Sequence, residues 1–266
     1  MAANPLRVDP SRTQTIRFQL ARQGRVKLKR MADDLQQAVQ YSTSWSQQTK
    51  TQKLASLQRW TRQLVATHLD RPNQDTYLAE EVRKAHAKGV ARSFDEAARA
   101  FSKSKDFNLG AKAQFSRDVR NRNRETIDLL VDTANNDIAH MGDQLIRQVA
   151  RDAGALIRKG ATGRQVRAAI RSAFQTIERK HLKAIVNVSI ISAHAEGQLD
   201  GFEMVGVKRV GIRAEWVTAK DEHVCRQCAQ REQRTYTLLQ ARGLLPFHVG
   251  CRCVWRLSRV GFKVRK

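Results

Sequence analysis

The sequence predicts an α+β protein in which a body of long helices precedes a small, C-terminal, β-rich domain that resembles a zinc-binding module. Three observations predict this fold class. Apolar residues recur with helical period up to about residue 200, a β-branched and glycine-punctuated stretch follows residue 201, and every cysteine lies within residues 225–253. The 266 residues suffice for one large domain or two modest ones with a real hydrophobic core.

The N-terminal part of the chain reads as three successive helices. They are expected at about 11–40, 46–69 and 74–92, and the Asp-Arg-Pro-Asn segment at 70–73 separates the second from the third. The whole chain has four prolines, so long helices are rarely interrupted. The polar, aperiodic stretch 102–110 is expected to be a loop.

Two apolar stripes give the strongest helical signal. The first consists of Ile127, Leu130, Val131, Ala134, Ile138, Met141, Leu145 and Val149. The second consists of Val166, Ile170, Phe174, Ile177, His181, Ile185 and Val188. Steps of three and four residues place each stripe on one helical face, so His181 is expected in the core. Gly160 and Gly163 flank a possible Thr162 cap, which predicts two long antiparallel helices joined there.

These signals divide the chain into three parts. Residues 1–110 are expected to form an N-terminal helical region, and residues 111–200 the two long antiparallel helices. Residues 201–266 are expected to form a Cys/His metal-binding-like β module with a basic tail. Within this last part, 204–218 and 251–257 alternate as strands do.

The cysteines and one histidine have the spacing of a metal site. Cys225 and Cys228 form a C-x-x-C pair, in which a tight turn points both thiols at one ion. His248 and Cys251 repeat that spacing, and Cys253 shares a strand face with Cys251. We expect a structural Zn²⁺ held by Cys225, Cys228, His248 and Cys251, with Cys253 as the substitute for His248.

Two other uses of the cysteines compete with metal binding. One is a pair of disulfides, and the other is a redox C-x-x-C. The N-terminus shows no apolar targeting segment, so we expect the protein to be made and used in a reducing cytoplasm, where structural disulfides are disfavoured. A thioredoxin-like βαβ pattern, which would accompany a redox motif, does not surround the pair.

A catalytic zinc keeps one position open for water, whereas this segment offers five candidate ligands for four positions. The surplus favours a closed structural site. Asp221, Glu222 and His223 precede the first cysteine and could imitate a nuclease constellation, but a polar turn whose Asp caps the knuckle or orients a ligand is the commoner arrangement. Trp216 and Trp255 bracket the module and are expected to form its hydrophobic core rather than a base-stacking platform.

The charge is strongly positive. Lys and Arg number 49 against 25 Asp and Glu, which gives a formal net charge of +24 and a pI near 10.9. Such a surplus usually meets a polyanion, although a basic solubilising surface is the alternative. The residues expected to contact nucleic acid lie near the two chain ends: Arg12, Arg17, Arg22, Arg25, Lys27, Lys29, Arg30, Arg259, Lys263, Arg265 and Lys266.

The kind of binding follows from the composition. Aromatic residues make up 6% of the chain and do not alternate with basic ones, so base stacking is not expected. We expect non-specific, phosphate-dominated contact with double-stranded DNA that weakens steeply with salt. A solvated helix face explains the arginines at 117–124 better than it explains the basic residues at the two termini. No stretch approaches the roughly 20 apolar residues needed to cross a bilayer, so no membrane is expected as a partner.

One segment resembles a known family. The stretch 214–228, with its Trp and an Asp shortly before C-x-x-C, and the ending Pro-Phe-His-Val-Gly-Cys-Arg-Cys at 246–253 resemble the C-terminal domain of the phage Mu F-like head morphogenesis family. These are minor capsid proteins of tailed phages. The motif-bearing similarity covers about 160–257. The sequence departs from the pattern at two places. Phe247 and Val249 flank the histidine, and residues 229–233, which follow the second cysteine, lack the glycine that is usual there.

The resemblance implies a non-enzymatic minor head protein. It implies head morphogenesis through binding of the portal protein or the major capsid protein, with contact to packaged DNA, in the virion and in the host cytoplasm during assembly. A zinc-dependent, HNH-like nuclease that uses His223 or Asp221 is the alternative. A zinc-ribbon regulator of transcription would need a base-reading helix–turn–helix, and none is evident.

Overall fold

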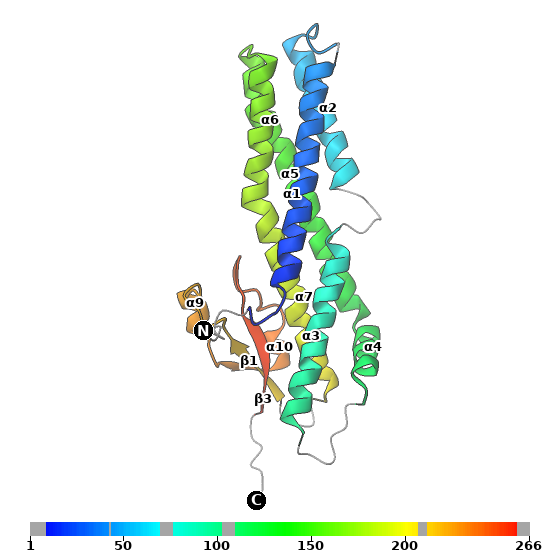
Figure 1. Cartoon of the computed structure of the whole chain (residues 1–266), viewed down its shortest axis with the longest axis vertical. Helices are drawn as coiled ribbons and strands as arrows, with labels where there is room; N and C mark the ends of the chain where they lie inside the picture. Colours follow the sequence, from blue (N-terminus) through cyan, green and yellow to red (C-terminus); the bar gives the residue numbers. More distant parts are fainter. Residues whose placement is uncertain (1–8, 43, 70–76, 103–109, 207–211, 260–266) are drawn as a thin grey trace, which may run out of the picture. The chain divides into compact units, whose positions relative to one another are not determined.

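The computed structural model describes residues 9–42, 44–69, 77–102, 110–206 and 212–259. Its long helices are α1 (Gln14–Tyr41), α2 (Lys50–His68), α3 (Ala79–Ala100), α4 (Lys112–Arg122), α5 (Arg124–Arg158), α6 (Gly163–Ile177) and α7 (Lys183–Met204). The C-terminal module contains β1 (Ile212–Val217), α9 (Arg226–Ala229), β2 (Thr235–Tyr236), α10 (Leu238–Ala241) and β3 (Val254–Arg259). The mainly helical chain with a small C-terminal sheet confirms the predicted α+β class (Figure 1).

The chain folds into two compact units, each built from segments far apart in the sequence. Unit 1 comprises Met1–Arg17, Ala79–Asp132 and Asn187–Lys266, and unit 2 comprises Phe18–Leu78 and Thr133–Val186. The three parts expected from the sequence were consecutive, so their boundaries do not coincide with these units. α1, α5 and α7 each contribute residues to both units.

Unit 2 is helical in its described residues. α2 and α6 begin with the same device: Thr49 and Thr162 each accept a hydrogen bond from the backbone N–H three residues on, which completes a capping box. The expected Thr162 cap is therefore confirmed. Gly160 has a φ of 76°, a left-handed conformation that glycine adopts without strain, and it lets the chain reverse between α5 and α6.

The first apolar stripe lies inside the protein as predicted, with Ile138 and Leu145 fully buried. The second stripe fails after Ile177, where a π-helical segment, Glu178–Leu182, connects α6 with α7. A π turn holds one extra residue, so the buried face moves one position along the sequence. His181 is half-exposed, and the core positions are Leu182 and Val186 instead. The prediction of a core histidine at 181 was wrong for this reason.

In unit 1, α3 and α7 approach so closely that their backbones nearly touch. A Cβ added at Gly89 would lie 2.1 Å from the His194 carbonyl oxygen, and a Cβ at Gly197 would lie 2.1 Å from the His86 carbonyl oxygen. Only glycine at both positions permits this crossing. It positions two buried histidines, His86 and His194, which are each 2% exposed.

Replacing one of these glycines is expected to separate the two helices. We expect Gly197→Ala to lower the free energy of unfolding by about 1–3 kcal/mol, because backbone rather than a flexible side chain opposes the new methyl group. Urea unfolding followed by circular dichroism measures this cost. Gly163→Ala is the matched control, since its Cβ would come no closer than 3.6 Å to Arg167. Equal stability of the two variants would contradict the close crossing.

The sheet has the order β2-β1-β3, and both pairings are antiparallel. Trp216 of β1 lies opposite Trp255 of β3. Along β1 the buried positions are Ile212, Ala214 and Trp216, which is the alternation expected of a strand with one covered face. The strand expected from 204 onward begins only at 212, because α7 continues to Met204; residues 207–211 lie outside the described part of the chain.

We expect His194 to make the stability of the protein sensitive to acid. Burial, followed by the charge of Arg92, lowers the pKa of His194 from 6.5 to about 3. Between these values the unfolded chain binds a proton that the folded chain does not, so stability falls as the pH drops below about 6.5. We expect the wild type to lose about 2 kcal/mol more than His194→Gln between pH 7 and pH 5.

Urea midpoints at the two pH values measure the difference. His140→Gln is the control, because His140 is exposed. If His140→Gln removed as much of the acid sensitivity as His194→Gln does, burial of His194 would not be its cause.

Candidate metal centre

Five candidate ligands reach the same place from two short segments. Cys225 is the N-cap of α9, and its Sγ accepts a hydrogen bond from the Cys228 N–H at 3.4 Å. On the second segment, the Cys251 N–H donates to the His248 carbonyl oxygen at 3.0 Å. Gly250, at a φ of 84°, supplies the left-handed residue that this turn requires. Both pairs therefore sit on tight turns, as their two-residue spacing predicted.

The donor atoms are close enough to share an ion. His248 Nε2 lies 3.2 Å from the Sγ atoms of both Cys225 and Cys228. Those three form one group with all donor atoms within 4.8 Å of one another, and Cys228, Cys251 and Cys253 form a second. Ligand atoms around a tetrahedral ion with metal–sulfur bonds of about 2.3 Å are about 3.8 Å apart. The cluster could therefore hold one metal ion, with Cys228 belonging to both groups.

The histidine is oriented for ligation. Its Nδ1 lies 2.9 Å from the Val249 carbonyl oxygen, which can only accept a hydrogen bond. Nδ1 therefore carries the proton, and Nε2, the nitrogen beside the thiols, keeps its lone pair. Metal-bound histidines commonly have such a partner on the second nitrogen.

The thiols have different proton affinities. The hydrogen bond from Cys253 lowers the pKa of Cys251 to about 5, while burial raises the pKa of Cys228 to about 12. Several adjacent buried thiolates repel one another, so they do not ionise together without a cation. All four cysteines carry free thiols, and no disulfide joins any of them.

Asp221 contacts the second ligand segment through Arg252 rather than through a cysteine. Arg252, which lies between two of the candidate ligands, donates to Asp221 Oδ1 at 2.5 Å and to Oδ2 at 2.6 Å. Asp221 Oδ1 also accepts the His223 N–H at 3.1 Å. This bidentate pair fixes the Cys-Arg-Cys segment against the 218–224 turn. The expected polar turn is present, and its Asp orients the ligand segment.

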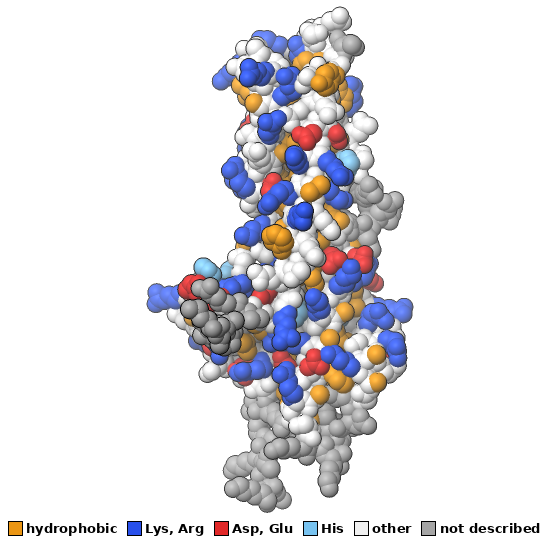
Figure 2. Space-filling view, viewed as in Figure 1, with side chains coloured by type: hydrophobic (Ala, Val, Ile, Leu, Met, Phe, Trp, Pro, Cys, Tyr) orange, Lys and Arg blue, Asp and Glu red, His pale blue; other side chains and the backbone are white. Residues whose placement is uncertain are grey.

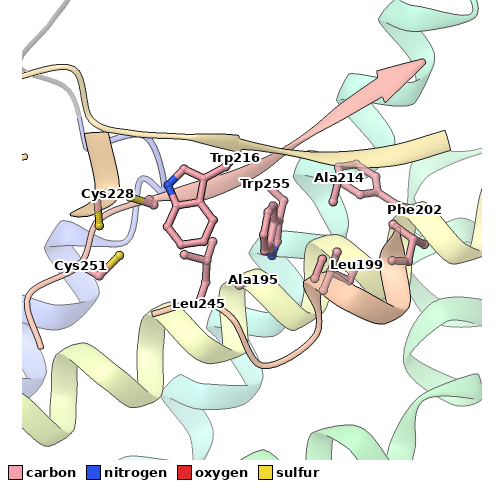
Figure 3. Close-up of a cluster of buried hydrophobic side chains, with 12 residues drawn as sticks. Ala195, Leu199, Phe202, Ala214, Trp216, Cys228, Leu245, Cys251 and Trp255 are labelled. Atoms are coloured by element: carbon pink, nitrogen blue, oxygen red, sulfur yellow. The ribbon is translucent and has the colours of Figure 1, made fainter. Parts of the chain in front are cut away.

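The two tryptophans form the core of the module, as predicted. Both are fully buried, and their ring centroids are 5.4 Å apart in an edge-to-face arrangement. Cys228, Cys251 and Leu245 pack against the same cluster (Figure 3). The metal site and the hydrophobic core of the module are therefore continuous.

Side chains from the helices of unit 1 hold β3 in place. Gln198 of α7 donates to the Trp255 carbonyl oxygen at 2.6 Å and accepts the Trp255 N–H at 3.1 Å, as a neighbouring strand would. Glu96 of α3 accepts the Leu257 N–H at 2.9 Å. The edge of the sheet is thus covered by helices.

An ionic network that is buried at Asp200 and open to solvent at Glu203 links Arg242, the residue after α10, to the same helices. Arg242 contacts Glu196 at 2.9 Å and both Asp200 and Glu203 at 2.8 Å, and Asp200 also contacts His86 at 2.8 Å. Sequence reasoning missed these residues. The sequence signal that could have found them is a group of polar residues, Glu196, Gln198 and Asp200, within an otherwise apolar helical stretch, because polar residues in the interior need partners.

The residues expected to bind nucleic acid differ in accessibility. Arg17 is 9% exposed and paired with Asp9, so it is less accessible to a partner than the other members, and its expected role stays a prediction. Arg25 pairs with Glu178 at 2.6 Å. Lys27 lies 4.9 Å above the ring of Tyr77. The exposed members are Arg12, Arg22, Arg25, Lys29 and Arg30, of which Arg25 is the one paired with an acidic residue in the described part of the chain.

Of the residues near the C-terminus that were predicted to bind nucleic acid, the structure describes one. Arg259 ends β3, and Lys263, Arg265 and Lys266 lie outside the described residues.

Comparison of the chain with protein-family models, curated proteins and solved structures gives no match. Within the described segments, no helix combines the length and hydropathy needed to span a bilayer.

Proposed function

We propose that the chain is a minor head protein of a tailed phage that acts in head morphogenesis, binds the portal protein or the major capsid protein, and contacts double-stranded DNA non-specifically. The observation that carries the proposal is the structural use of the family-like motif. The motif residues share one module: Trp216 lies in its core, Asp221 holds Arg252, and the two cysteines of the Cys-Arg-Cys ending are candidate ligands. On this proposal the protein works in the virion, and in the host cytoplasm during assembly.

The proposed metal is Zn²⁺ in a structural role. Sulfur and imidazole donors favour zinc over magnesium or calcium, which prefer oxygen ligands. The ligand surplus supports a closed coordination sphere without an open position for water. Cys225, Cys228 and Cys251 are the proposed constant ligands, and either His248 or Cys253 completes the site.

The charge supports the DNA contact. A net charge of +24 favours a polyanionic partner, and basic side chains outnumber acidic ones over the face shown in Figure 2. Exposed Arg22, Lys29 and Arg30 of α1 can approach phosphates without breaking an ion pair seen among the described residues. Such contacts carry no base specificity.

The nuclease alternative is less well supported. Arg252 uses both carboxylate oxygens of Asp221, whereas a catalytic carboxylate would face the metal or the substrate. His223 is largely exposed, and its ring lies 3.6 Å from Glu222. Metal-dependent DNA cleavage that was lost in His223→Ala would favour the alternative over the head-protein proposal.

Co-sedimentation tests the head-protein proposal. The full chain is co-expressed with the portal and major capsid proteins of the same genome, and the particles are separated on a density gradient. We expect the protein to travel with procapsids or with the portal, and Cys228→Ser to remain in the soluble fraction. Gln227→Ser, a change at an exposed neighbouring position, is the matched control. A wild-type protein that stays soluble alongside assembled procapsids would overturn the proposal.

A further inference from the structure

A second concave site lies in unit 1, apart from the metal centre. It is a cavity of about 890 Å³, bounded by the 9–12 segment, by one face of α3 and by His194 of α7. That volume is in the range of small-molecule sites. Four basic side chains line it: Arg12, Lys88, Arg92 and Arg99.

The acidic residues of the cavity are already neutralised. Asp9 pairs with Arg17, and Asp95 pairs with Lys112 at 2.7 Å. Arg12 and Lys88 are exposed and have no acidic partner among the residues that the structure describes. The cavity therefore carries an excess of positive charge that nothing within the described chain compensates, and this attracts an anion.

The wall that presents Arg12 is held in a fixed conformation. Asp9 accepts hydrogen bonds from the Ser11 N–H at 3.0 Å and the Ser11 hydroxyl at 2.7 Å. Arg12 itself has a φ of 53°, a left-handed conformation that non-glycine residues rarely adopt. The Pro10 carbonyl oxygen accepts a hydrogen bond from Arg92 of α3. These contacts anchor the segment that carries Arg12 on α3 and fix where Arg12 leaves the backbone.

His194 supplies a polar side chain at the wall of the cavity. The residue is 2% exposed and lines the cavity. Because His194 lines the cavity, its imidazole can hydrogen-bond to a ligand there. The low pKa of His194, about 3, keeps the ring neutral. It can therefore donate one hydrogen bond without adding charge.

We propose that this cavity binds a phosphate group, with Arg12 and Lys88 as the principal cationic contacts and His194 as a neutral hydrogen-bond donor. The phosphate comes either from a nucleic-acid backbone or from a free nucleotide. The first source rests on the DNA contact proposed above, whereas the second does not.

Binding measurements on the full chain test the proposal with two probes. Fluorescence anisotropy follows a labelled double-stranded oligonucleotide over a salt series, and adenosine monophosphate is the competitor and, by calorimetry, the second ligand. The test variant is Arg12→Gln/Lys88→Gln. The control is Arg59→Gln/Arg62→Gln, which removes the same charge from exposed positions of α2. Circular dichroism checks that both variants are folded.

We expect the test variant to bind the duplex about 10-fold more weakly than the control and to lower the slope of log affinity against log salt by about two. If adenosine monophosphate also binds the wild type, and the test variant loses it, a free nucleotide enters the site. If only the duplex is affected, the ligand is the backbone phosphate. A wild type that binds the nucleotide but not the duplex would reject the DNA contact and keep the site. A test variant that binds both probes as the control does would overturn the inference.

Discussion

Replacing Cys228 with serine is expected to abolish metal binding and unfold the C-terminal module. Cys228 is 1% exposed and is the one residue shared by both groups of candidate ligands. Structural zinc contributes about 10–16 kcal/mol of binding free energy, which is available as folding free energy, so losing a shared thiolate removes a large part of it. The near-ultraviolet dichroism of Trp216 and Trp255 should collapse, and chelation of the wild type should have the same effect.

The helices of unit 2 should survive this change, because unit 2 contains none of the five candidate ligands. Far-ultraviolet dichroism should therefore fall only slightly. In the near ultraviolet, the contribution of Trp216 and Trp255 should be lost, while that of the stacked pair Trp45 and Trp60 in unit 2 should remain. Gln227→Ser controls for the serine itself, since Gln227 is exposed on the same turn. A Cys228→Ser protein with unchanged metal content and unchanged tryptophan dichroism would show that this thiol is not a ligand.

Truncating Trp216 is expected to produce the second large loss of stability. We expect Trp216→Ala to lower the free energy of unfolding by about 3–5 kcal/mol, because the side chain is fully buried and leaves a cavity beside Trp255. The indole N–H of Trp216 has no hydrogen-bond partner in the part of the chain that the structure describes, so its contribution is one of packing.

Two further variants sharpen that measurement. Trp216→Phe keeps an aromatic ring and loses no hydrogen bond, so its cost in urea unfolding should be well below that of the alanine variant. Leu239→Ala should be nearly neutral, because Leu239 is 84% exposed. If Trp216→Ala were as stable as Leu239→Ala, the tryptophan pair would not be the core of the module.

The local features of this fold could be predicted from the sequence. Helical period, the Thr162 cap and the two-residue spacing of the ligands are each encoded within a few neighbouring residues, so they needed no knowledge of the tertiary structure. The tryptophan pair could be predicted because large aromatic residues at strand positions are seldom exposed. The apolar stripes correctly predicted the buried helix faces, because apolar residues at helical spacing are seldom exposed, up to Ile177, where the π-helical segment follows.

The features that sequence reasoning missed depend on how the chain packs in three dimensions. The π segment displaced His181 from the core, and nothing in the stripe itself marks an extra residue. Arg17 was assigned to a basic surface, yet Asp9 holds it in the interior. The pairing of Gln198 with Trp255 joins residues 57 positions apart. A single sequence does not reveal such pairs, since their energies come from burial that only the tertiary structure creates.

The central claim is that the C-terminal module is organised around one structural zinc ion. Elemental analysis of protein purified with zinc present, combined with zinc-edge X-ray absorption, tests it most directly. We expect one zinc per chain in a four-coordinate shell with sulfur at about 2.3 Å. Three sulfurs and one nitrogen would identify His248 as the fourth ligand, and four sulfurs would identify Cys253. Less than one zinc per chain, or a shell dominated by oxygen, would contradict the claim.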